Sequence, residues 1–267
     1  DAREMPLLGL GVYKATEDAE LKQAIGDAVS FGYHLIDTAS FYKNEEGIGK
    51  ALKTLSIPRE DLFITTKIWN TAQRIGDIED SFHRSLERLG LDYVDLYLIH
   101  WPVPGCFCDT WHAMEKLQAQ GKIKSIGVSN FSIQDLETLM ASTDIIPAVN
   151  QVEFHPLFNH PQLLAYCKEH HIAVQVYAPL ARGAYLNSPL MIEIGKRHEK
   201  TPAQIGLRWL LQQGISVIPK SVHKDRIEEN SQLFDFTLTE EMAAITAMDI
   251  QQRVAGIPED MIPYITK

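Results

Sequence analysis

Short apolar runs alternate with longer amphipathic segments eight times along this chain, and this alternation limits the fold more than any other feature. The apolar or β-branched runs predict strands at residues 7–10, 34–38, 62–68, 94–100, 123–128, 148–153, 173–177 and 216–219. The remaining segments predict helices at residues 18–31, 44–54, 77–89, 109–120, 132–141, 161–170, 189–213 and 224–231. Strands that alternate with helices are typical of a parallel sheet, so the chain is predicted to be an α/β protein.

The eight units follow one another without interruption, which favours a closed (β/α)8 TIM barrel. No linker or low-complexity tract divides the sequence, so a single domain is expected over residues 1–267. An open doubly wound sheet stays the alternative architecture. Such a sheet usually carries G-x-G-x-x-G after its first strand, whereas Gly9-Leu10-Gly11 is followed by residues 12–14 without a third glycine. If a dinucleotide binds, its phosphates must be held in some other way.

Helix start signals support this reading of the chain. Asn70-Thr71 is expected to precede a helix, and Ser132 with Asp135 three residues later resembles a capping box. Thr201-Pro202 places proline at a first helical position within the helical stretch 189–213.

Composition disfavours several classes of function. The formal net charge of −10 at pH 7 argues against a nucleic-acid partner, because such proteins neutralise phosphates with Lys and Arg. The 3 cysteines lack the spacing of a zinc site, so no metal is expected, and they indicate reduced thiols in the cytoplasm. No window approaches a membrane span and no leader is visible at the start, so no membrane partner is expected.

Residues that can do chemistry end most of the predicted strands. In a barrel the C-terminal ends of the strands meet at one mouth, so side chains from distant segments can form one site. The candidates are Asp37 with the nearby Tyr42, then Lys67, His100 with Trp101, Ser129 with Asn130, Gln151, and Tyr177.

Lys67 ends a largely apolar strand, where a buried ammonium needs a partner. Asp37 can hold Lys67 charged, and Lys67 can in turn favour the phenolate form of Tyr42. Two charges about 4 Å apart interact by roughly 4 kcal/mol at an effective dielectric of about 20, enough to lower the pKa of a phenol by up to about 3 units. Tyr42 is then expected to be a general acid near neutral pH, and His100 to orient a carbonyl oxygen.

The chain resembles the aldo-keto reductase family over nearly its whole length, and most closely the bacterial members near 2,5-diketo-gluconate and methylglyoxal reductases. The matching stretches are 31–39 with Tyr42 and Asn44-Glu45, then 66–69, 92–102, 127–131, 150–153 and 218–221. This resemblance implies Asp37, Tyr42, Lys67 and His100 as the catalytic residues. It also implies hydride transfer from NADPH to an aldehyde or ketone. A monomer is expected.

A basic cluster at residues 220–226 stands out in an acidic chain, where the eighth predicted strand leads into a helix. Lysine and arginine donors there suit a phosphate, although such a cluster can also be a solvated turn. By the resemblance, this end of the cofactor site holds the 2′-phosphate and adenine of NADPH rather than NADH. The residues implied are Lys220, Ser221, Arg226, Glu229 and Asn230.

At the other end of the cofactor, the resemblance implies that Tyr177 stacks on the nicotinamide. Ser129, Asn130 and Gln151 would hydrogen-bond its carboxamide, and Leu180 lies in the segment 178–183 that would cross the pyrophosphate. Two positions depart from the family pattern: alanine stands at 178, where serine is frequent, and His34 replaces an arginine.

Substrate contacts are expected from His100 and from aromatic residues near the mouth, namely Tyr13, Trp69 and Trp101, with Phe131 as a further candidate. Aromatic walls and short loops favour a broad range of small carbonyl compounds. The tail at residues 251–267 is expected to fold over the mouth.

Two other functions stay open. A regulatory or binding protein of the same fold would keep the nucleotide, but the complete set of four residues counts against it. A cofactor-free barrel hydrolase or isomerase is disfavoured by the basic cluster and by the lack of metal-ligand spacing.

Overall fold

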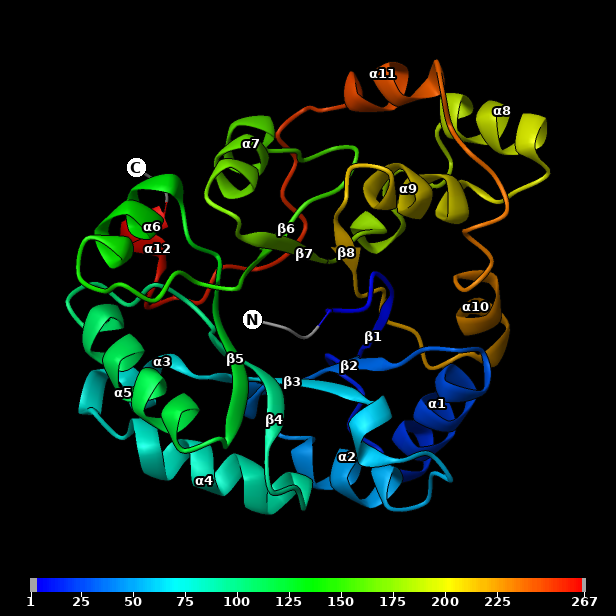
Figure 1. Cartoon of the computed structure of the whole chain (residues 1–267). Helices are drawn as coiled ribbons and strands as arrows, with labels where there is room; N and C mark the ends of the chain where they lie inside the picture. Colours follow the sequence, from blue (N-terminus) through cyan, green and yellow to red (C-terminus); the bar gives the residue numbers. More distant parts are fainter. Residues whose placement is uncertain (1–3, 266–267) are drawn as a thin grey trace.

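The computed structural model describes residues 4–265, and it contains one sheet of 8 parallel strands paired in sequence order. Figure 1 shows the strands around a central axis with helices outside them. The strands are β1 (Gly9–Gly11), β2 (Leu35–Asp37), β3 (Phe63–Ile68), β4 (Val94–Ile99), β5 (Ile123–Ser129), β6 (Val149–Glu153), β7 (Ala173–Tyr177) and β8 (Ser216–Val217). The predicted TIM barrel and its eight strands are confirmed. Residues 1–3 and 266–267 of the expected domain and tail lie outside the described residues.

Contacts between β1 and β8 close the barrel. Parallel bridges join Leu8 to Val217 and Gly11 to Lys220, and Val217 N donates to Leu7 O over 2.8 Å. A side chain at Gly11 would place its Cβ 2.7 Å from Ile218 O, so glycine is needed for this approach. Gly11 therefore serves barrel closure, whereas Gly9 leaves room for the Leu35 side chain of β2.

The helices predicted from the sequence lie between the strands or, for the last of them, after β8. They are α1 (Asp18–Ser30), α2 (Glu45–Leu52), α4 (Ile78–Leu89), α5 (Phe107–Ala119), α6 (Ile133–Met140), α7 (Pro161–Glu169), α8 (Pro189–His198), α9 (Pro202–Leu211) and α10 (Lys224–Glu229). The capping box of Ser132 and Asp135 is confirmed, and Thr201 forms another with Gln204.

Several helical features differ from the prediction. Residues 189–213 form two helices, because Glu199 ends α8 in the left-handed region with φ of 54° and Thr201-Pro202 begins a new helix. Asn70 and Thr71 lie inside a short helix, α3 (Asn70–Ile75), instead of preceding one. Two further short helices, α11 (Glu241–Thr246) and α12 (Ile262–Ile265), were not predicted, since one turn carries little periodic pattern.

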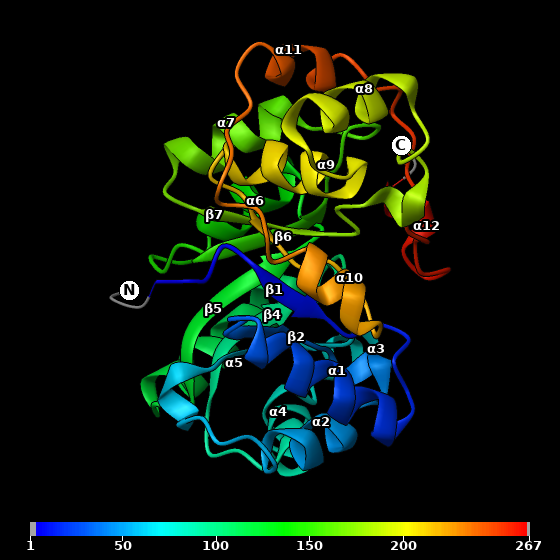
Figure 2. The same ribbon diagram turned by 90° about the vertical axis from the view of Figure 1, so that its right-hand side faces the viewer.

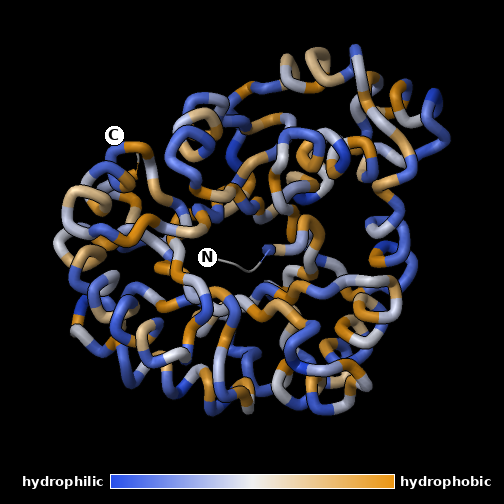
Figure 3. The backbone as a smooth tube through the Cα atoms, in the orientation of Figure 1, coloured by the Kyte–Doolittle hydropathy of each residue, from blue (hydrophilic) through white to orange (hydrophobic). Residues whose placement is uncertain are grey.

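Alternation along the strands decides which side chains enter the barrel. Leu96 and Leu98 of β4 pack inside the barrel with Leu35 and Phe63, whereas Tyr97 and Ile99 join the larger core against the helices. Asp37, Lys67 and His100 continue these inward faces at the C-terminal ends of β2, β3 and β4. In Figure 3 apolar residues line much of the strands, and polar residues dominate the outer turns. The same alternation that builds the core thus aims the polar side chains into the mouth.

Figure 2 shows the first described residues, in blue, and the C-terminal α12, in red, on opposite sides of the barrel. The C-terminal segment thus lies at the end of the barrel where the strands finish. Within residues 4–265, no helix combines the length and the apolar character needed to cross a membrane.

Candidate active site

A buried ion pair lies at the centre of the mouth. Lys67 Nζ donates to Asp37 Oδ1 over 2.6 Å and to Thr38 O over 2.8 Å. Gln151 Nε2 donates to the other carboxylate oxygen of Asp37 over 2.7 Å. Both oxygens of Asp37 are therefore bonded, and the lysine ammonium is held in one place.

Burial and mutual attraction act in opposite directions on this pair. Burial raises the pKa of Asp37 and lowers that of Lys67, and the attraction between the two groups opposes both shifts. With a contact of 2.6 Å and side-chain exposures of 0% and 3%, the loss of either partner would leave a buried charge without compensation.

Tyr42 lies beside this pair because its loop is tied to two strands. It ends the short helix η1 (Ser40–Tyr42), in which Ser40 Oγ donates to Lys67 O over 2.9 Å. Asn44 fixes the following turn by donating to the carbonyl oxygens of Val12 and Ala15. Lys67 Nζ lies 5.2 Å from the centre of the Tyr42 ring. The expected proton donor is thus next to the ion pair.

The expectation that Lys67 lowers the pKa of Tyr42 is wrong. Burial raises the pKa of Tyr42 well above 10.0, and the negative charge of Asp37 adds to the shift. Desolvation of the phenolate, with repulsion from Asp37, outweighs the expected attraction to Lys67. A raised pKa keeps Tyr42 protonated at neutral pH, which is the form that can donate a proton.

His100 follows β4 and faces the Tyr42 ring edge-on, with ring centres 5.7 Å apart. Burial lowers the pKa of His100 well below 6.5, and the positive charge of Lys67 lowers it further. The imidazole is therefore neutral at neutral pH and has one N–H to donate. Its buried Nδ1 has no hydrogen-bond partner within the part of the chain that the structure describes.

Aromatic rings surround the tetrad of Asp37, Tyr42, Lys67 and His100. Tyr13 lies 4.9 Å from Tyr42 between ring centres, and Trp69 lies 5.0 Å from His100. Trp101 is buried beside Trp69 in a small apolar cluster. The sequence analysis missed Phe41, which stacks on Trp69 at 3.8 Å although it directly precedes Tyr42. The candidate Phe131 instead packs in the core, with 1% of its surface exposed.

Three of the four residues expected at the nicotinamide lie together. Tyr177 OH donates to Asn130 Oδ1 over 2.6 Å, and Asn130 Nδ2 donates to Ser129 Oγ and His100 O. Gln151 differs, because its amide nitrogen donates to Asp37 and to Gln175 Oε1. That nitrogen holds the tetrad in place, a role that strand-end position alone did not indicate.

Strained backbone is frequent in loops that follow the strand ends. Lys43, Asn130, Ala178, Ala181 and Arg182 all have positive φ, between 47° and 64°. Left-handed conformations of residues other than glycine are uncommon and gather at functional sites. Leu180 lies among them, half-buried, in the segment expected to cross the pyrophosphate.

The basic end of the predicted cofactor site is open to solvent. Lys220 and Arg226 are exposed, and neither forms an ion pair among residues 4–265. Ser221 is buried and accepts from His223 N, and Asn230 is buried next to α10. Glu229 accepts a hydrogen bond from Thr201 over 2.9 Å, which fixes its carboxylate at the start of α9. Two free cations thus lie beside the end of β8.

Residues 251–265, here called the C-terminal tail, lie along the mouth. Met261 is buried against Trp101 and Val103, while Arg253 pairs with Glu153 at the end of β6. The sequence analysis expected a tail over the mouth but did not identify either partner of this pair as functional.

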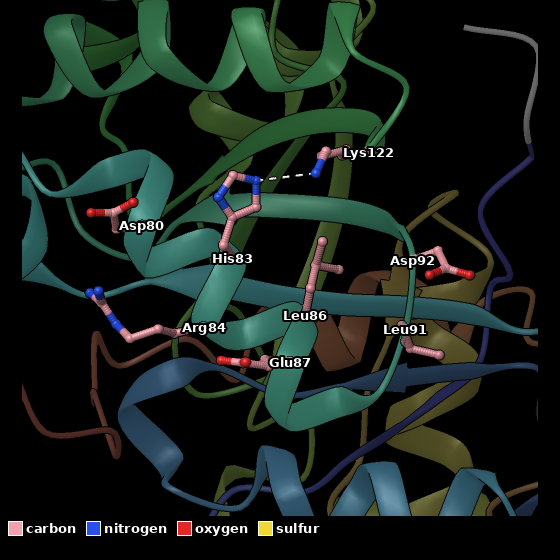
Figure 4. Close-up of a pocket in the computed structure, with 8 residues that line it drawn as sticks. All are labelled: Asp80, His83, Arg84, Leu86, Glu87, Leu91, Asp92 and Lys122. Carbon is pink, nitrogen blue, oxygen red and sulfur yellow. Dashed lines mark hydrogen bonds between the residues drawn. The ribbon is translucent and has the colours of Figure 1, made fainter.

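A separate shallow cavity of about 450 Å³ lies on the side of α4, outside the mouth. Figure 4 shows that charged side chains surround it, with Lys122 bonded to His83. Its lining contains none of the predicted site residues and carries three carboxylates, two cations and His83. No group of His, Cys, Asp and Glu side chains in the described ranges could hold a metal ion.

Comparisons with known proteins converge on one family. The sequence profile described as "Aldo/keto reductase family" matches residues 7–250. A glyoxal reductase of Bacillus subtilis is 46% identical over 97% of this chain and 94% of its own length. A methylglyoxal reductase of Yersinia pestis is 47% identical over 97% and 94%. The solved structure of the aldose reductase from Schistosoma japonicum superposes with a TM-score of 0.89 at 39% identity, over 94% of this chain and 91% of that one.

Proposed function

We propose that this chain, which belongs to the aldo/keto reductase family, reduces small aldehydes and ketones to alcohols with NADPH. The observation that carries the proposal is the protonated Tyr42 beside the Asp37–Lys67 pair and the neutral His100. Proton donors without an adjacent protein nucleophile suit hydride reduction of a carbonyl group. The names of the glyoxal and methylglyoxal reductases among its relatives agree with this class of substrate.

The residues at both ends of the predicted cofactor site fit NADPH. Lys220 and Arg226 are exposed cations without an ion-pair partner among residues 4–265, and both suit the 2′-phosphate. Tyr177 is half-buried at the mouth and offers a ring on which the nicotinamide can stack. Ser129 and Asn130 would bind the carboxamide in place of the hydrogen bond that they now form with each other. The amide nitrogen of Gln151 is already bonded to Asp37 and Gln175, so only its amide oxygen could accept a hydrogen bond from the carboxamide. When bound, NADPH supplies a hydride to the carbonyl carbon.

The side chains of the protein act on the carbonyl oxygen. His100 donates its single N–H to this oxygen and thereby orients the substrate. Negative charge grows on the oxygen during reduction, so its basicity rises towards that of an alkoxide. Tyr42 then transfers its phenolic proton to the oxygen, and Lys67 stabilises the phenolate that remains. Asp37 and Gln151 keep Lys67 in place throughout.

The mouth favours small substrates without a specific pattern of polar groups. Tyr13, Phe41, Trp69 and Trp101 provide apolar surface around His100. Such walls discriminate weakly between substrates that differ by one methylene group. We therefore propose a broad specificity, and on the sequence features given above we also propose a cytoplasmic monomer.

Consumption of NADPH tests the proposal directly. With methylglyoxal or a nitrobenzaldehyde present, the near-ultraviolet absorbance of NADPH should fall in proportion to the alcohol formed. The absence of turnover with a panel of small aldehydes and ketones, despite NADPH binding, would favour a nucleotide-binding protein of the same fold.

The cofactor preference is expected to depend on Arg226. The variant Arg226→Ala should bind NADPH about 10- to 100-fold more weakly, because a charge-assisted bond to the 2′-phosphate contributes roughly 1.5–3 kcal/mol. Binding of NADH, which lacks this phosphate, should change little. Titrations monitored by tryptophan fluorescence would measure both constants, and Arg84→Ala provides a control at an exposed arginine of α4, outside the cofactor site. Equal losses for both nucleotides would show that the phosphate contact lies elsewhere.

A further inference from the structure

The carboxylate of Glu153 is fully buried at the end of β6 and receives donors from two parts of the chain. Its Oε1 accepts from the backbone N–H groups of Val254 and Ala255, over 2.6 and 3.0 Å. The same oxygen lies 3.2 Å from His155 Nε2, and Oε2 accepts from Arg253 Nε over 3.0 Å. Burial alone would raise the pKa of Glu153, but these hydrogen bonds together lower it.

This arrangement specifies the position of the C-terminal tail. If residues 253–255 moved away, Glu153 would lose three of its donors. A carboxylate buried away from water stays ionised only while such donors compensate its charge. The hydrogen bonds that residues 253–255 donate to Glu153 therefore hold the tail at the end of β6, although residues 251–265 form no β-bridge.

Arg253 also reaches the predicted nicotinamide platform. Its terminal nitrogen lies 3.4 Å from Tyr177 OH, which is long for a hydrogen bond. Its guanidinium lies 5.9 Å from the centre of the Trp101 ring and 5.6 Å from that of Phe158. One side chain of the tail thus contacts the expected cofactor platform and a wall of the substrate pocket.

The hydrogen bonds run in one direction from the tail to the tetrad. Arg253 donates to Tyr177 OH, Tyr177 donates to Asn130, and Asn130 donates to His100 O. In such a chain each bond polarises the next, and a shift of the first donor changes the position of the groups that follow. The ring of Tyr177 is therefore fixed through its hydroxyl at both sides.

We propose that Arg253 is a positioning residue through which the C-terminal tail fixes the ring of Tyr177, so that seating of the tail and binding of the cofactor stabilise each other. The inference rests on the proposed function, because it takes Tyr177 as the surface for the nicotinamide. By linkage, any factor by which a seated tail strengthens cofactor binding must equal the factor by which the cofactor favours a seated tail.

Binding constants of three variants test this coupling. Arg253→Lys keeps a positive charge for Glu153, but a point charge cannot contact Glu153 and Tyr177 together. It should raise the dissociation constant of NADPH about tenfold, within the usual range of coupling between sites. Tyr177→Phe keeps the ring but removes the hydroxyl, and should raise this constant several-fold. The double variant should have an NADPH dissociation constant no higher than the higher of the two single-variant constants.

A second anchor of the tail provides the matched control. Arg74 donates to Asp260 over 2.9 Å at the far end of the tail and has no contact with Tyr177. The variant Arg74→Met should therefore leave the NADPH constant unchanged, because the contacts with Glu153 keep residues 253–255 seated without this partly exposed pair. Hydrogen exchange adds a readout without turnover: NADPH should slow exchange of the Val254 and Ala255 amides in the unaltered protein, and do so much less in Arg253→Lys.

The outcomes separate the two proposals. If the unaltered protein does not bind NADPH, the proposed function is wrong and the coupling with it. If NADPH binds equally well to the unaltered protein and to Arg253→Lys, only the coupling is wrong. Strictly additive losses in the double variant, or equal losses in Arg74→Met and Arg253→Lys, would also overturn it, because the effect would then not pass from Arg253 through Tyr177.

Discussion

Replacement of Tyr42 by phenylalanine is expected to lower kcat for carbonyl reduction by about 10³-fold or more. The ring, and hence the packing against Tyr13, is retained, but the proton donor is lost. The pKa of Tyr42 is raised, so its hydroxyl is protonated at neutral pH. The variant therefore loses a group that is in the proton-donating form. The dissociation constant of NADPH should stay nearly unchanged, as measured by quenching of tryptophan fluorescence.

The control for this variant is Tyr166→Phe, which removes a phenol from the outer helix α7 and should keep full kcat. If Tyr42→Phe retained more than about a tenth of kcat, a loss well below the range for general acids, the assignment of Tyr42 as proton donor would be wrong. A parallel loss of NADPH binding would instead indicate damage to the site.

The second large effect is expected for Lys67→Met, on both stability and activity. This change leaves the Asp37 carboxylate buried without its cation, and breaking such a pair from one side usually costs about 3–5 kcal/mol of unfolding free energy. The phenolate of Tyr42 also loses the positive charge that stabilises it during proton transfer. We expect kcat to fall by at least about 10²-fold, with the stability loss measured by denaturant unfolding.

The double variant Asp37→Asn/Lys67→Met separates stability from chemistry. With both charges removed, most of the lost stability should return, because replacing a buried ion pair by neutral groups is often nearly neutral. Activity should remain low, since Lys67 is still absent. Lys50→Met, which removes an exposed cation paired with Asp18, should leave stability and kcat unchanged. Recovery of activity in the double variant would contradict the role given to Lys67.

Much of the barrel follows from local pattern in the sequence. The apolar residues of β3 and β4 mark both strands, and their alternation places Lys67 and His100 on the inner face. The pattern failed in residues 189–213, where apolar spacing continues across the break at Glu199. Thr201-Pro202 is a helix start signal, and it predicts that a new helix begins there, within residues 189–213.

The site was less predictable where partners come from distant strands. Gln151 could be placed at a strand end, but its bonds to Asp37 and Gln175 depend on how β6 packs across the barrel. Arg253 lies in a segment without periodic pattern, 100 residues from its partner Glu153. The direction of the Tyr42 pKa shift likewise depends mainly on how deeply its loop is buried. An estimate from the charges of Asp37 and Lys67 alone leaves this burial out.

Isotope labelling of NADPH tests direct hydride transfer to the substrate. NADPH carrying two deuterium atoms at the reactive carbon of its nicotinamide ring should be incubated with this protein and a nitrobenzaldehyde. Each nitrobenzyl alcohol formed should carry one deuterium on its alcohol carbon, as measured by mass spectrometry, with one NADPH consumed per alcohol. An alcohol without deuterium, or NADPH consumed without alcohol, would contradict direct hydride transfer at this site.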